Sequence, residues 1–368
     1  MIKRYKTLIK TILGALLLGF MAATPAKAQF TDIGAFLDAG ANDAAILTRE
    51  YLRPFPTGFG TGLNAGFTES ATPKKLFGFS LQIRPSIAAV PGSDQSFDVT
   101  ELNLEKIRLA SGEDPIAQTI AGSQTSGPLL EIFDDPNDPN RTKIGELRLP
   151  EGTGFSYVPA PIIQASIGLI KKTDLTVRYL PETGLDKYGD ISILGGAIKH
   201  ELGQYIPGGK LLPVDISVMV GFNQITVNGN LDVNPNGVRS TNDPTLTSNP
   251  NPNFDDQQVQ TTTNTFVVNA LVGKTLPFIS VYGGLGFQNA EFELDIKGDY
   301  PVSTIDPLNP ATDSYNVITD PFGYKQSSES NVHLLGGFRL KLGFLAFYGE
   351  ATLANYFTAN AGIGISFR

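Results

Sequence analysis

Few side chains in this sequence belong to the types that carry out catalysis or bind metal ions. The chain has no cysteine, which excludes thiol catalysis, thiolate metal sites and a disulfide framework. Its two histidines are His200 and His333, so a three-histidine metal site is impossible. Both lie in segments that alternate like β-strands, where a single histidine is more often a polar residue lining an interior. We therefore expect no catalytic residue, no metal site and no cofactor.

The glycine-containing motifs do not fit the nucleotide-binding patterns. The "GKT" at 273–275 lacks the upstream glycine of a phosphate-binding loop, because Val268 stands in its place. The glycines of "GFGTGLNAG" at 58–66 fall on alternate positions outside any strand–helix–strand unit, so they form no dinucleotide fingerprint. No G-x-S-x-G sequence marks a hydrolase nucleophile.

Two weaker chemical alternatives remain. A hydrolase could pair a histidine with a serine without any motif, and the candidate serines are Ser80, Ser192 and Ser217. The stretch "DDPNDPN" at 134–140 offers oxygen ligands suited to calcium, but it lacks the spacing, glycine and closing glutamate of an EF-hand. Solvated turn residues are the better interpretation of that stretch.

Residues 1–28 have the plan of a secretory signal peptide. A basic start precedes the apolar run "TILGALLLGFMAA", and "AKA" stands before Gln29 as a cleavage site. This segment holds five of the 28 Lys and Arg and no acid, which leaves 23 basic against 36 acidic residues and a net charge of about −13. Such a charge argues against nucleic acid, or an anionic lipid surface, as a partner.

Most of the remaining chain alternates apolar with polar residues, as β-strands do. In "PVDISVMVGFN" at 213–223 every second residue is apolar, and the region 331–368 keeps its His, Arg, Lys and Glu on the other face. The segments run for about 9–12 residues, which suits tilted strands that cross a bilayer, whereas sandwich strands are commonly about 5–6 residues long.

Short and long connections take turns along the chain. The short ones are 70–75, 171–174, 205–211, 274–277 and 341–343, and the long ones are 91–158, about 229–260 and 298–330. Short turns on one rim and long polar loops on the other are typical of outer-membrane barrels. We therefore predict an all-β fold, an antiparallel transmembrane β-barrel in the cell outer membrane, exported by the signal peptide.

Charged residues on the polar strand faces would be unfavourable against lipid. We expect them to line the barrel lumen or to hold a segment inside it. The predicted lumen-lining residues are Arg84, Asp174, Arg178, Asp215, His333, Arg339, Lys341 and Glu350.

The segment before the strands has helical rather than strand spacing. Residues 31–53 predict one or two amphipathic helices, which Pro54 ends. We assign 29–56 as a helical plug of the lumen and 57–368 as the barrel; a helix lying in the periplasm under the barrel is the alternative. The residues expected to act in the plug are Phe36, Leu37, Leu47, Arg49 and Tyr51.

The strand count carries an internal contradiction. It is 11 when 57–68 is taken as the first strand, or 13 with a hairpin drawn from 97–109 and 142–149. A closed antiparallel barrel needs an even number, so one segment is misassigned. We expect 12–14 strands.

The stretch at 43–91 resembles the start of an uncharacterised outer-membrane protein family of Bacteroidota. The matching residues are Asp43-Ala44, Tyr51-Leu52, Pro54, Asn64, Gly66, Lys74-Lys75 and Gly78-Phe79. The resemblance implies export and a barrel, and it brings no substrate or catalytic residue. The plan is also distantly similar to long-chain fatty-acid channels, whose 14-stranded barrel an N-terminal segment plugs.

We expect a channel or transporter for small molecules, hydrophobic ones included, gated by the plug. The first alternative is a non-transporting outer-membrane barrel with a structural or surface-interaction role; a secreted soluble β-protein and an enzyme follow. The expected partners are outer-membrane lipid, a small hydrophobic ligand, and the barrel assembly machinery through the C-terminal strand.

Overall fold

The computed structural model describes residues 36–37, 40–133, 143–184, 189–235, 237–239, 249, 251–305, 313–328 and 331–367. The signal peptide at 1–28 and the calcium candidate at 134–140 lie outside the described residues.

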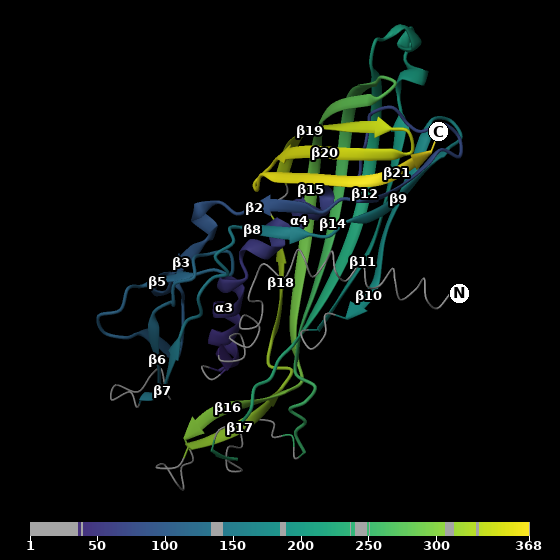
Figure 1. Ribbon diagram of the computed structural model, residues 1–368. Coiled ribbons are helices and arrows are strands. Elements are labelled where there is room, and N and C mark those ends of the chain that lie inside the picture. The colour runs from purple at the N-terminus through teal and green to yellow at the C-terminus, as the bar shows by residue number, and fades with distance from the viewer. Residues whose placement is uncertain are drawn as a thin grey trace.

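Ten strands of the described chain close into an antiparallel barrel (Figure 1). Each strand pairs with its neighbours, and the first pairs with the last, so that Phe79 lies opposite Phe367 and Ile83 opposite Ile363. The strands in spatial order are β1 (Phe79–Ile83), β9 (Ile163–Leu169), β10 (Thr173–Gly184), β11 (Gly189–Glu201), β12 (Asp215–Asn230), β14 (Gln258–Thr275), β15 (Ile279–Lys297), β19 (Asn331–Leu342), β20 (Leu345–Leu353) and β21 (Thr358–Phe367).

Three further strands prolong this wall. β2 (Ser86–Ala89) continues β1 and pairs with β21 and β8, while β8 (Tyr157–Ala160) leads into β9. β18 (Gly323–Ser327) leads into β19 and pairs with β15. Pro85 and Pro161 stand at the two breaks near the start of the wall, where a residue without an N–H interrupts the hydrogen-bond ladder.

The prediction of an antiparallel barrel is confirmed, and ten strands replace the expected 12–14. The misassigned segment is 57–68, most of which belongs to a helix. The proposed hairpin from 97–109 and 142–149 lies outside the barrel in small sheets of its own. These are β3 (Ser96–Asp98) with β5 (Ile116–Gln118), and β4 (Ile107–Leu109) with β6 (Leu129–Phe133) and β7 (Lys143–Arg148).

The outer face of the barrel is apolar and the inner face is polar. In β19, Val332 is 66% exposed on the outside while its neighbour His333 is 3% exposed on the inside. Other exposed apolar side chains of the outer face are Leu81, Val177, Leu194, Phe222, Phe266, Leu285, Phe347 and Ile363. An apolar exterior around a polar interior is the arrangement of a barrel that crosses a lipid bilayer.

The two ends of the barrel differ. At the short-turn rim, brief connections join β9 to β10, β11 to β12, β14 to β15 and β19 to β20; the β11–β12 turn holds the 3₁₀ helices η5 (Gly203–Tyr205) and η6 (Gly209–Leu211). At the long-loop rim, the connections carry the small sheets above and a third one, a group that we name the loop layer. The third sheet contains β13 (Val238–Arg239), β17 (Asp313–Thr319) and β16 (Asp299–Ile305), and the 3₁₀ helices of the layer are η2 (Gly92–Asp94) and η3 (Val99–Glu101).

Helix α3 (Ala41–Tyr51) belongs to the loop layer (Figure 1). Leu47 and Tyr51 lie in one apolar cluster with Ile107 of β4 and with residues at the loop ends of β14 and β15. The Asp43 carboxylate accepts hydrogen bonds from the backbone N–H groups of 105, 106 and 107, at 2.8, 2.8 and 3.1 Å. These contacts fix α3 at the long-loop rim.

Helix α4 (Pro54–Asn64) lies inside the barrel (Figure 1). A Cβ built on Gly58 would lie 2.4 Å from Val158 of β8, and one on Gly60 would lie 2.7 Å from Ala290 of β15. The helix therefore packs closely against the wall on two sides. Glycine is required at these positions because a larger side chain would clash with the wall. No helix among the described residues is both long and apolar enough to cross a membrane.

We predict that Gly60→Ala destabilises the folded barrel by about 1–3 kcal/mol, the usual penalty for overpacking. Alanine is the better helix former, so a loss of stability would report the wall contact rather than helix propensity. The control is Gly92→Ala in the loop layer, where an added Cβ meets nothing within 4 Å. Urea titrations, with folded and unfolded protein separated on gels without heating, measure both variants; equal midpoints would contradict the tight fit.

Candidate functional site

The lumen is occupied by residues 54–76, which we name the luminal segment. It consists of α4 followed by a stretch without regular secondary structure, and it runs from the long-loop rim to the short-turn rim. At its far end the Phe77 N–H donates to the Gly168 carbonyl at 2.8 Å, directly before β1 begins. Every residue from 60 to 71 is buried. The chain thus passes through its own barrel before it forms the first strand.

Arg178 of β10 caps the C-terminal end of α4. Its guanidinium donates to the carbonyls of Leu63 and, at 2.8 Å, Ala65, and it lies 3.5 Å from the centre of the Phe67 ring. The last carbonyls of a helix have no partner within the helix and carry the negative end of its dipole. Arg178 forms no ion pair with a carboxylate among the described residues. Its buried positive charge is stabilised instead by the C-terminal end of α4.

Arg84, at the end of β1, and Glu350, on β20, hold the next residues of the luminal segment. Arg84 donates to the Thr68 carbonyl at 2.6 Å, and Glu350 accepts from the Gly66 N–H at 2.6 Å. The two charged groups are 3.6 Å apart, and the Tyr282 hydroxyl lies 2.7 Å from Glu350. Gly66 has φ of +76°, a conformation that suits glycine, where the chain leaves the helix.

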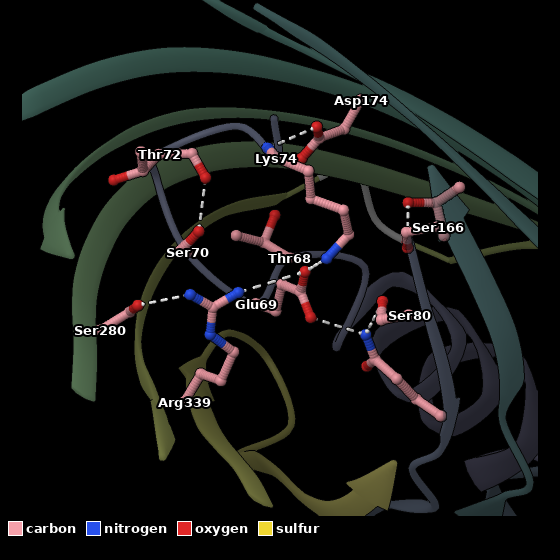
Figure 2. A network of polar contacts seen from close by, with 12 residues as sticks. Thr68, Glu69, Ser70, Thr72, Lys74, Ser80, Ser166, Asp174, Ser280 and Arg339 are labelled. Carbon is pink, nitrogen blue, oxygen red and sulfur yellow. Dashed lines mark hydrogen bonds and ion pairs between the residues drawn. The ribbon is translucent and has the colours of Figure 1, made fainter. Parts of the chain in front are cut away.

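A second group of charges lies nearer the short-turn rim (Figure 2). Glu69 of the luminal segment forms ion pairs with Lys74 and, at 3.5 Å, with Arg339 of β19. Figure 2 shows both cations directed at this carboxylate. The Gln82 amide donates to its other oxygen at 2.9 Å.

Asp174 and Lys199, on neighbouring strands of the wall, complete this group. They form an ion pair at 3.0 Å, Asp174 accepts from the Lys74 backbone N–H at 2.8 Å, and Lys199 donates to the Ser70 carbonyl at 2.6 Å. The Ala71 carbonyl accepts from the Ser217 hydroxyl at 2.5 Å. The wall thus supplies donors and acceptors to a buried, irregular backbone.

The luminal segment leaves little space beside the wall strands that it contacts. Between the luminal segment and strands β9 to β12, a cavity of about 10 Å³ is lined by residues such as Glu69, Asp174 and Lys199. That volume holds about one water molecule.

The predicted lumen-lining residues have the following positions. Arg84, Asp174, Arg178, His333 and Glu350 are buried inside the barrel, and Asp215, Arg339 and Lys341 lie partly buried toward the short-turn rim. Asp215 accepts from the Thr72 hydroxyl at 2.5 Å, and the His333 ring lies 2.8 Å from the Asn269 side-chain oxygen. Six of the eight form a hydrogen bond or ion pair with the luminal segment: Arg84, Asp174, Arg178, Asp215, Arg339 and Glu350.

The residues predicted to act in the plug lie at the long-loop rim, and 29–35 and 38–39 of the predicted plug lie outside the described residues. Phe36, Leu37, Leu47 and Tyr51 pack on apolar residues of the loop layer, and Arg49 pairs with Glu50. The lumen is filled instead by 54–76, which is rich in glycine and small polar residues. Sequence reasoning missed Glu69, Lys74 and Lys199; the alternation along β11 points Lys199 inward and could have identified it.

The histidines and two of the serines considered for hydrolase chemistry have the following partners. The His200 ring lies 2.8 Å from the Thr173 hydroxyl and 3.0 Å from the Tyr205 hydroxyl, and His333 bonds Asn269. Ser217 donates to the luminal backbone, and Ser80 accepts from Gln82. In the part of the chain that the structure describes, no three acidic or histidine side chains are grouped to hold a metal ion.

We predict that Glu350→Gln destabilises the barrel by about 3–5 kcal/mol, because it leaves the buried Arg84 without its carboxylate. The matched control is Glu293→Gln, which removes one partner of the exposed Glu293–Lys325 pair on β15 and β18 and should change stability little. Urea midpoints in lipid vesicles compare the two. A Glu350→Gln midpoint equal to that of the control would show that the buried pair does not hold the segment.

Comparison with solved structures finds outer-membrane barrels at low similarity. The attachment invasion locus protein Ail of Yersinia pestis is 8% identical, with 80% of this chain and 100% of Ail covered and a TM-score of 0.24. The translocator domain of the autotransporter NalP from Neisseria meningitidis is 10% identical, with 89% and 98% covered and a TM-score of 0.29. The outer membrane transporter YddB from Escherichia coli is 8% identical, with 76% and 39% covered and a TM-score of 0.29. The fold of this chain is established by its own strand pairing.

No curated protein matches the chain. A family described as being of unknown function, DUF6588, matches residues 5–367. Because this match spans nearly the whole sequence, the chain belongs to the DUF6588 family.

Proposed function

We propose that this protein is an outer-membrane channel for small solutes and that the luminal segment, residues 54–76, is its gate. The apolar outer face of the barrel supports the location in a bilayer. The occupied lumen is then the resting state, and passage requires the luminal segment to move.

The observation that carries this proposal is the chemistry of the wall behind the luminal segment. Small polar side chains face it from most strands: Ser80, Gln82, Gln164, Ser166, Thr176, Ser217, Asn223, Thr265, Asn269, Ser280 and Asn360. A lumen of this kind would fill with water if the segment withdrew. We infer small hydrophilic solutes rather than the hydrophobic ones considered from the sequence.

Many of the contacts that hold the luminal segment are polar ones that water can replace. Below α4 they are hydrogen bonds and ion pairs with wall residues such as Arg84, Lys199 and Glu350. The apolar contacts of this stretch form one small cluster, in which Phe67 and Ala71 pack on the wall. Polar contacts exchange for hydration at a modest net difference in free energy, whereas a large apolar interface would not. Opening also requires α4 to move, because the helix packs against β8 on one side of the lumen and β15 on the other.

A second function is favoured by the loop layer. It has an apolar core of its own, built from α3, β4, β6 and the loop ends of β14 and β15. Loops built into a cohesive layer suit a barrel whose role is to bind a partner at the surface. This is the non-transporting alternative, and a flux measurement separates it from the channel.

The flux test uses a disulfide that ties the gate to the wall. A Cβ built on Gly62 lies 3.2 Å from the Cβ of Ala160, slightly under the usual disulfide spacing of about 3.5–4.5 Å. We expect vesicles with Gly62→Cys/Ala160→Cys protein to swell in arabinose no faster than protein-free vesicles when oxidised, and to recover on reduction. Gly62→Cys alone, indifferent to reductant, is the control.

Wild-type protein must admit the sugar faster than protein-free vesicles do. If it does not, or if the oxidised double variant stays as permeable as the reduced one, the gated channel is rejected and the surface role remains.

Location and orientation are tested by single cysteines, because the chain has none of its own. We expect Ser111→Cys in the loop layer and Asn42→Cys on α3 to react with an impermeant maleimide on intact cells. Lys274→Cys at the short-turn rim should react only after the outer membrane is permeabilised, since short turns face the periplasm. Labelling of Lys274→Cys alone on intact cells would invert the orientation.

A further inference from the structure

The exposed charged residues described at the short-turn rim are lysines. The stretches 70–78, 170–173, 202–214, 274–278 and 341–344 contain seven lysines and no Asp or Glu. The acids that border these stretches are buried or partly buried: Glu69, Asp174, Glu201 and Asp215. The connection 90–156 at the opposite rim contains 12 Asp and Glu against five Lys and Arg. The net negative charge of the chain therefore conceals a separation of charge along the barrel axis.

The lysines of the short-turn rim are largely uncompensated. Lys75, Lys171 and Lys274 are exposed and have no carboxylate within ion-pair distance among the described residues. Lys172 pairs with Glu201 at 3.0 Å, and Lys341 is repelled by Lys75 and Arg339. Like charges gathered at one rim favour the approach of an anion.

Three lysines at the long-loop rim are different. Lys143 pairs with Glu131 and Glu146, Lys297 with Asp320, and Lys325 with Glu293. Each of these cations is already neutralised within the protein. They provide a matched set of the same residue type at the other end of the barrel.

Large apolar side chains stand beside the uncompensated lysines. Leu211 is 87% exposed, and Ile170 and Phe278 are both 68% exposed, all in the turns themselves. Further exposed apolar residues of this rim are Leu76, Phe77, Tyr205, Leu276, Leu342 and Phe344. They prolong the lipid-facing surface beyond the ends of the strands, into the depth where headgroups meet acyl chains.

We propose that the short-turn rim is a binding surface for anionic phospholipids of the adjoining leaflet. The ammonium groups of Lys75, Lys171 and Lys274 contact the lipid phosphates, and the neighbouring apolar side chains contact the acyl chains. A soluble polyanion would match the lysines alone, whereas a phospholipid matches both and is continuous with the lipid-facing face of the barrel. The inference uses the bilayer location of the barrel and is independent of transport.

The experiment measures which lipids surround the wild-type protein. The protein is folded into phosphatidylcholine vesicles that contain a trace of spin-labelled phosphatidylglycerol or spin-labelled phosphatidylcholine, and electron paramagnetic resonance gives the motionally restricted fraction of each. We expect a preference for phosphatidylglycerol of at least about twofold at low salt, which added salt abolishes because headgroup attraction is screened.

Two triple variants locate the preference. Lys75→Gln/Lys171→Gln/Lys274→Gln should restrict both lipids equally, whereas Lys143→Gln/Lys297→Gln/Lys325→Gln should keep the wild-type preference. Equal restriction of both lipids by the wild type at low salt, or loss of the preference in the long-loop triple only, would overturn the proposal. The salt series on the wild type decides the question even where a variant fails to fold. If neither spin-labelled lipid shows a motionally restricted fraction, the protein has not entered the bilayer. That result would contradict the bilayer location on which this proposal rests.

Discussion

The structure depends on one requirement: an irregular stretch of backbone, enclosed by a barrel, must find its hydrogen-bond partners on the wall. After Asn64 the luminal segment has no helix or sheet of its own, and burying an unpaired backbone group costs about 1–3 kcal/mol. Arg178 meets this requirement for the carbonyls of Leu63 and Ala65, and Arg84 meets it for those of Gly66 and Thr68. The two buried cations themselves need partners of opposite charge. Arg84 is matched by Glu350 and the Tyr282 hydroxyl, and Arg178 by the negative end of the α4 dipole. The irregular backbone of the luminal segment requires polar partners on the inner face of the wall. Those polar side chains in turn hold the segment in the lumen.

The outer surface follows from the opposite requirement, and the same period-two alternation satisfies both. In β19, His333 and Arg339 point toward the lumen while Val332 and Phe338 point outward. A shift of register by one residue would expose the charges to lipid and bury the apolar residues against a polar segment. The pairing register of the strands is therefore determined both by the apolar residues that face the bilayer and by the polar residues that contact the luminal segment. Glycines on the inner face, such as Gly221 against Phe67, leave the space that the segment fills.

Sequence alone predicted much of the wall and little of what fills it. Alternation predicted the barrel strands because successive residues of a strand face lipid and lumen in turn, so the sequence of each strand is apolar and polar in turn. It failed at 57–68, where Gly58, Gly60 and Gly62 have a strand-like spacing although they belong to a helix. Their spacing arises because different sides of α4 meet β8 and β15, which is a property of the assembled barrel. The contacts of Glu69 with Arg339, or of Arg178 with Ala65, join residues more than 100 positions apart, and no local pattern encodes them. The apolar spacing of α3 was interpreted correctly as helical, yet its partner surface consists of loop residues whose arrangement no periodicity records.

The path of the chain through its own ring has a consequence for assembly. α3 stands at one rim, β1 begins at the other, and the seam between β1 and β21 joins the two ends of the strand sequence. The interior space around 54–76 is too small for a helix to be drawn through it afterwards. The wall must therefore assemble around a segment already in place, and the pairing of β1 with β21 completes the enclosure. Until that moment the paired charges of the interior are open to water, and their neutralisation accompanies the final closure.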